Sequence, residues 1–89
     1  MENYKKNKME ILKEIMVKGH HKNFEVVFIM MKNEYEGISV YRVYSMLKKN
    51  GEVIDIDESI STFSEHDAED YFDMLVNTYL RYRYAKKIK

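Results

Sequence analysis

Two β-rich segments joined by an Asn-Gly pair constrain the fold of this chain more than any other feature. The segment "ISVYRVYSML" (38–47) is rich in β-branched and tyrosyl residues, and "EVIDID" (52–57) alternates apolar and acidic residues. Asn50-Gly51 lies between them, and this pair is the preferred centre of a two-residue β-hairpin turn. In that register Lys49 faces Glu52, which is a favourable pair of opposite charges. The sequence therefore predicts an antiparallel hairpin.

A third segment, "NFEVVFIMMK" (23–32), precedes this hairpin and is rich in Val, Ile and Phe, which are enriched in strands. We therefore expect a three-stranded antiparallel meander, with strands near 24–32, 38–47 and 52–57. An alternative stays open, a mostly α, winged-helix-like fold in which Gly37 and Gly51 end two middle helices. It is based on four residues that also fit helical spacing: Val40, Val43, Tyr44 and Leu47.

Helices are predicted at both ends of the chain. Near the N-terminus apolar residues recur at helical spacing, and Gly19 provides a stop, so we expect a helix over 2–18. The residues of this spacing are Met9, Leu12, Ile15 and Met16. Ser64 is a good N-cap for a long C-terminal helix over 64–86, with acidic residues where the helix dipole favours them. Its apolar stripe would pack on the sheet: Ala68, Tyr71, Phe72, Leu75, Tyr79 and Tyr82.

Length and composition are those of one small domain, so we expect residues 1–89 to form a single α+β domain. The absence of cysteine excludes disulfides, thiolate metal sites and cysteine nucleophiles. No apolar run is long enough to cross a bilayer, and the N-terminus lacks the features of a secretory signal. We expect a cytoplasmic protein of a bacterial or archaeal host that does not bind membranes.

Acidic residues are concentrated in one part of a chain whose net charge is zero. Residues 50–80 contain nine Asp and Glu and no Lys or Arg. The helix dipole accounts for acids in the first turns of a helix but not for those that precede it. A concentrated negative surface attracts a basic partner. Two interpretations therefore stay open, a solvated helix start or a partner-binding surface of eight residues: Glu52, Asp55, Asp57, Glu58, Asp67, Glu69, Asp70 and Asp73.

The order helix, meander, acidic helix, with the segments "KNGEVIDIDES" and "SEHDAEDYFD", resembles small phage-encoded anti-CRISPR proteins. Those that block DNA-cleaving CRISPR effectors often present an acidic face that imitates DNA. The resemblance implies a non-enzymatic inhibitor or accessory protein of phage or mobile-element origin. Its acidic face would dock on a basic surface of a protein partner, such as a nucleic-acid-binding nuclease. The net charge of zero departs from the strongly acidic members, which favours a more general inhibitor or adaptor role.

The C-terminal segment "YLRYRYAKKIK" (79–89) supports an alternative function. It alternates aromatic and basic residues, and Arg with Tyr can contact phosphates and stack on bases. The alternative is a small nucleic-acid-binding regulator that uses Arg81, Arg83, Lys86 and Lys87.

Nucleophilic catalysis has no support in the sequence. A metal-dependent nuclease is a third hypothesis, in which Asp55 and Asp57 with Glu52 or Asp67 hold a divalent ion, although the acidic segment lacks the lysine that two-metal nucleases usually have nearby. "DIDE" (55–58) and "EHDAED" (65–70) offer oxygen ligands but lack the pattern of a calcium-binding loop. The serines occur in no nucleophile motif, and no glycine-rich phosphate loop is present. We expect no catalytic residue, no metal site and no cofactor.

Tyrosine and methionine are also frequent in this chain, with eight and seven residues. Tyr35, Tyr41 and Tyr44 lie on or beside the second predicted strand. They either pack in the core or lie on a sheet face that no helix covers. In the second case they make an amphipathic surface suited to a partner or to a second copy. We expect a monomer or a homodimer.

Overall fold

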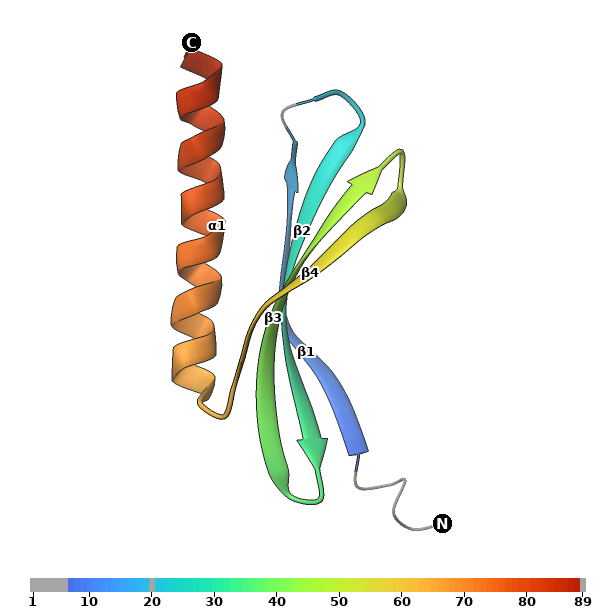
Figure 1. Ribbon diagram of the computed structural model, residues 1–89, viewed down its shortest axis with the longest axis vertical. Coiled ribbons are helices and arrows are strands. Elements are labelled where there is room, and N and C mark those ends of the chain that lie inside the picture. The colour runs from blue at the N-terminus through green and yellow to red at the C-terminus, as the bar shows by residue number, and fades with distance from the viewer. Residues whose placement is uncertain (1–6, 20, 89) are drawn as a thin grey trace.

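The chain folds as a four-stranded antiparallel sheet followed by one helix, which lies along one side of the sheet (Figure 1). The computed structural model describes residues 7–19 and 21–88, and the side chains of 8–19 and 21–81. The strands pair in the order β1-β2-β3-β4. The elements are β1 (Asn7–Lys18), β2 (Phe24–Tyr35), β3 (Ile38–Lys49), β4 (Glu52–Thr62) and α1 (Glu65–Ile88).

The prediction of an N-terminal helix over 2–18 is wrong, because the described part of this segment is strand β1, paired with β2. Its first positions lie outside the described residues. The pairing register shifts at Leu12, which is an extra residue of the bulge type. The shift reverses the alternation of faces, so Leu12 and Ile15 lie towards α1, whereas Met9 and Met16 lie on the opposite face. The extra residue divides β1 into two halves whose side chains alternate out of step with each other. This offset is what gives Met9, Leu12, Ile15 and Met16 the spacing of a helix.

The three strands predicted in the middle of the chain are confirmed, although the sheet has four strands and not three. The mostly α, winged-helix-like alternative is wrong, because residues 38–49 form β3. Asn50 and Gly51 have φ angles of 53° and 86°, and a hairpin turn of type I′ requires positive φ at both positions. Lys49 pairs with Glu52 across this turn, as predicted.

The C-terminal helix is confirmed, and it extends two residues beyond the predicted end, over Glu65–Ile88. The Ser64 hydroxyl accepts a hydrogen bond from the backbone N–H of Asp67 at 3.1 Å, which satisfies one donor of the first turn. The backbone N–H of Ser64 in turn donates to the hydroxyl of Thr62 at 3.2 Å. This short chain of hydrogen bonds fixes the direction in which α1 leaves β4.

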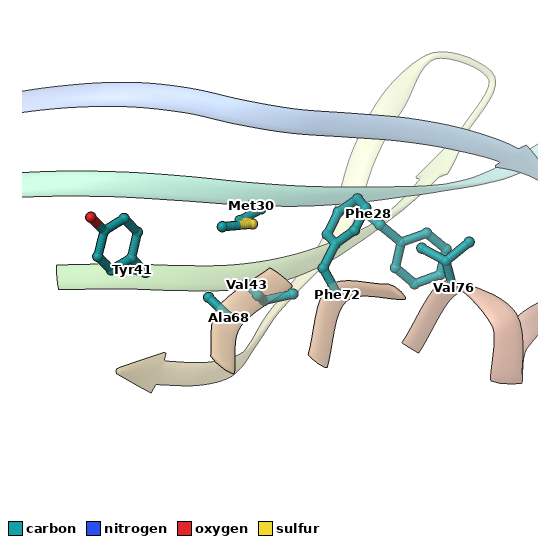
Figure 2. Packing of buried hydrophobic residues seen from close by; sticks show 7 residues of the cluster. All are labelled: Phe28, Met30, Tyr41, Val43, Ala68, Phe72 and Val76. Atoms are coloured by element: carbon teal, nitrogen blue, oxygen red, sulfur yellow. The ribbon is translucent and has the colours of Figure 1, made fainter. Parts of the chain in front are cut away.

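The core lies between α1 and one face of the sheet (Figure 2). The helix contributes side chains four residues apart, which is the spacing of one face of a helix. The phenyl ring of Phe28 also meets the ring of Tyr79 edge to face, with centroids 5.7 Å apart. Tyr82, the last residue of the predicted stripe, lies outside the described side chains. The buried cluster consists of Phe28, Met30, Tyr41, Val43, Ala68, Phe72 and Val76.

Strand β2 is buried on both of its faces. Phe28 and Met30 point towards α1, and Val27 and Ile29 point to the other side of the sheet. No described element covers that other side, which we call the open face (Figure 1). Nevertheless Val27 is only 3% and Ile29 only 8% exposed. Side chains of the neighbouring strands must therefore shield them within the open face itself.

Candidate functional site

The four acidic residues of β4 lie on an edge strand and are divided between its two faces. The register places Asp55 and Asp57 on the face towards α1, and Glu58 on the open face. All four side chains are exposed. Glu52 lies opposite Lys49 at the end of the hairpin. The predicted acidic surface is thus already interrupted within this strand.

Glu58 has a cationic neighbour on the open face. The Nε atom of Arg42 on β3 lies 3.8 Å from a carboxylate oxygen of Glu58. This Nε atom is buried and has no hydrogen-bond acceptor among the described residues, so Glu58 is its closest counter-charge. Glu58 therefore offsets the positive charge of Arg42 on the open face.

Glu69 and Asp73 are held by one lysine from the far edge of the sheet. The Nζ atom of Lys13 on β1 lies 2.9 Å from Glu69 and 3.5 Å from Asp73, and 5.5 Å from the centre of the Phe72 ring. The hydrogen bond between Lys13 and Glu69 raises the pKa of Lys13 and lowers the pKa of Glu69. Lys13 thereby relieves the repulsion between two carboxylates that lie one helical turn apart.

Asp67 and Asp70 complete the set on α1, and both are exposed. Asp70 lies 3.2 Å from Nε2 of His66, one turn earlier. Asp67 is in the first turn, where the helix dipole favours an anion. Among the described residues, no Lys, Arg or His nitrogen makes an ion pair with four of the eight predicted acids: Glu52, Asp55, Asp57 and Asp67.

The basic residues of the alternative prediction lie on the last turns of α1. Arg81 is exposed. The side chains of Arg83, Lys86 and Lys87 lie outside the part of the chain whose side chains the structure describes.

The ends of two hairpins form a shallow hollow of about 610 Å³. The backbone N–H of Asn50 donates to the carbonyl of Asn23 at 2.9 Å and so joins the two loops. Lys18 and Lys22 line this hollow together with Glu25. Their charges are mixed and the hollow is open, so it lacks the convergent polar groups of a small-molecule site.

The described residues, 7–19 and 21–88, contain no group of three or more His, Cys, Asp or Glu that could hold a metal ion. The same part of the chain has no helix with the length and apolarity needed to cross a membrane.

Comparison with protein-family models, with curated proteins and with solved structures found no match. Two features of the described residues stand out, the exposed carboxylates without an ion-pair partner and the open face.

The open face is the feature that the amino-acid sequence predicted least well. Its apolar side chains come from all four strands. The signal for it is the uninterrupted apolar run Val26–Met31, which is typical of a strand buried on both faces. Of the three tyrosines singled out, Tyr35 and Tyr44 lie on the open face, whereas Tyr41 is part of the core. The apolar residues of the open face are Met9, Ile11, Met16, Val27, Ile29, Met31, Tyr35, Ile38, Val40, Tyr44, Met46, Val53 and Ile56.

Proposed function

We propose that this chain is a non-enzymatic protein that binds the basic surface of another protein through Asp55, Asp57 and Asp67, the aspartates that form no ion pair with any described residue. One observation carries the proposal. Asp55 and Asp57 are exposed on one face of an edge strand, and their neighbours on β3 in the register are the uncharged Leu47 and Ser45. By contrast, Lys13 supplies a cation to Glu69 and Asp73, and Arg42 supplies one to Glu58.

Carboxylates without a nearby cation keep their full field in the solvent. Such a field speeds the encounter with a positively charged partner and disfavours partners of like charge. Because the chain begins with strand β1 and not with a helix, its element order no longer supports the resemblance to phage-encoded anti-CRISPR proteins, which now rests on the two acidic segments alone. On those segments we propose a DNA-cleaving CRISPR effector as the first partner class to test. Its nucleic-acid channel is lined with cations that recognise phosphate backbones. In that role the protein would act in the cytoplasm of a bacterial or archaeal host.

Acidic side chains on an edge strand have a second physical effect. They disfavour pairing of that edge with another sheet and so protect against aggregation. The two roles differ in what removal of the charges does. If edge protection were the whole role, neutral side chains would lower solubility and leave partner binding intact. If the acids contact a partner, their reversal abolishes binding in a protein that remains soluble.

The test is a charge reversal with a matched control. The variant is Asp55→Lys, Asp57→Lys and Asp67→Lys together, used as bait in extracts of the native host alongside the wild-type chain. A protein that the wild type captures should be lost with the variant, and its capture by the wild type should weaken as salt rises. The control reverses three acids on β1, β2 and the β2–β3 turn with the same change in net charge: Glu10→Lys, Glu34→Lys and Glu36→Lys.

The control bait should capture the same protein as the wild type. Equal capture by the wild type and by the variant with three reversed aspartates would refute the proposal. Far-UV circular dichroism of each bait checks that the fold is retained. Purified partner would then be tested for inhibition of its DNA cleavage by the wild type. The alternative function, nucleic-acid binding through Arg81, Arg83, Lys86 and Lys87, rests on the sequence pattern alone.

A further inference from the structure

We propose that the open face is the interface of a symmetric homodimer, in which two copies of the sheet pack face to face. An antiparallel sheet with helices on one side normally presents polar side chains to water on the other. Here the open face breaks that rule. Met16 and Ile56 are apolar, lie on the two edge strands and are 58% and 59% exposed. Contiguous exposed apolar surface of this kind marks an interface.

The centre of the open face is already packed. In the register, Met16, Val27, Met46 and Ile56 form one row across all four strands. Every member of this row is apolar, and Val27 is almost fully buried by its neighbours. A partner would therefore meet a row that is already ordered at Val27 and exposed at its two ends, Met16 and Ile56.

The charges of the open face surround this centre and cancel. Three of the side chains are cationic and three are anionic. Three of the six lie at one end of the face, and the others are Glu14 on β1 and the Arg42–Glu58 pair on β3 and β4. A two-fold interface brings the same patch of both copies together, so it must be complementary to itself. A face without net charge avoids the repulsion between copies that a strongly charged face would cause. The charged residues are Glu14, Lys18, Glu25, Arg42, Lys48 and Glu58.

The size of the open face suits a stable dimer. Its strands have 11 or 12 residues. With a rise of about 3.3 Å per residue and a spacing of about 4.8 Å between strands, the face covers about 750 Å². A standard protein interface buries about 800 Å² on each partner, with an apolar centre and a polar rim. The open face therefore has the dimensions of a whole interface.

A second copy also fits the rest of the molecule. Asp55 and Asp57 point to the side of α1, so a dimer through the open face leaves them in solvent. The two helices would form the outer layers of a helix, sheet, sheet, helix arrangement. The homodimer is thus independent of the proposed partner binding and compatible with it.

The test measures molecular mass in solution. Light scattering coupled to gel filtration should give the wild type twice its chain mass of 10.8 kDa, with dissociation on dilution from about 100 µM towards 1 µM. The double variant Met16→Lys with Ile56→Lys should have a dissociation constant raised about 100-fold, because each dimer buries four new charges. Met74→Lys is the matched control, because Met74 is 50% exposed and lies on α1. It should remain a dimer.

A wild type that stays at 10.8 kDa over this range would overturn the proposal. A double variant that is as dimeric as the wild type would also overturn it, as would loss of the dimer in Met74→Lys. Circular dichroism checks that each variant is folded. Should the double variant unfold, Ile38→Lys at the end of β3 replaces it, since Ile38 is exposed on the same face. Both variants keep Asp55, Asp57 and Asp67, so failure here leaves the proposed partner binding testable.

Discussion

The substitution Phe72→Ala should remove a large part of the stability of this protein. Phe72 is 1% exposed and packs within the cluster formed by α1, β2 and β3 (Figure 2). Replacing a buried phenylalanine by alanine costs about 3–5 kcal/mol, from lost transfer free energy and the cavity left behind. Domains have about 0.05–0.15 kcal/mol of stability per residue, so the 89 residues here correspond to about 4–13 kcal/mol. A domain at the lower end of that range would unfold.

The chain offers a control with the same chemical change. Phe63, nine residues earlier, is 76% exposed, so Phe63→Ala should alter the free energy of unfolding by about 0.5 kcal/mol or less. Urea unfolding followed by circular dichroism, at one fixed protein concentration because association adds stability, measures both variants. The melting temperature of Phe72→Ala should fall by about 12 °C or more. A cost below about 1 kcal/mol for Phe72→Ala, or equal costs for both, would refute this description of the core.

Two further predictions concern α1. Ser64→Ala removes the hydroxyl that accepts the N–H of Asp67, and it should lower the free energy of unfolding by about 1 kcal/mol in the same urea assay. The hydrogen bond from Lys13 lowers the pKa of Glu69. The pair therefore stabilises the fold at pH values above the ordinary pKa of a glutamate. This stabilisation is lost as the pH falls through the lower pKa that Glu69 has in the folded state. In Lys13→Gln the melting temperature should therefore fall less between pH 6 and pH 3 than in the wild type, and parallel curves would contradict the assignment.

Local chemistry predicted the parts of this fold in which one residue type decides the backbone. Asn50-Gly51 indicated its turn because few other pairs accept positive φ at both positions. Ser64 indicated the start of α1 for a similarly local reason. Such signals do not depend on which segments meet in the folded chain.

The N-terminal segment shows why local pattern failed elsewhere. Its bulge at Leu12 exists only because β1 pairs with β2, and the resulting change of phase imitates helical spacing. Pairing between strands is a tertiary interaction that overrides local preference. The acidic set failed to form one surface for a related reason. The partner of Glu69 is Lys13, which is distant in sequence and reaches it only once β1 joins the sheet.

The apolar run Val26–Met31 connects the fold to the proposed dimer. A strand that is apolar on both faces needs cover on both, and a single helix can cover only one. The described chain places its remaining residues in the sheet itself, where β1 supplies an edge to β2 but no second layer. Neighbouring strands already shield Val27 and Ile29, but Met16 and Ile56 on the edge strands stay exposed, and in the dimer that we propose a second copy of the open face covers them. A dimer formed in this way carries two sets of Asp55, Asp57 and Asp67, so a partner with repeated basic sites would be bound more tightly than one set allows.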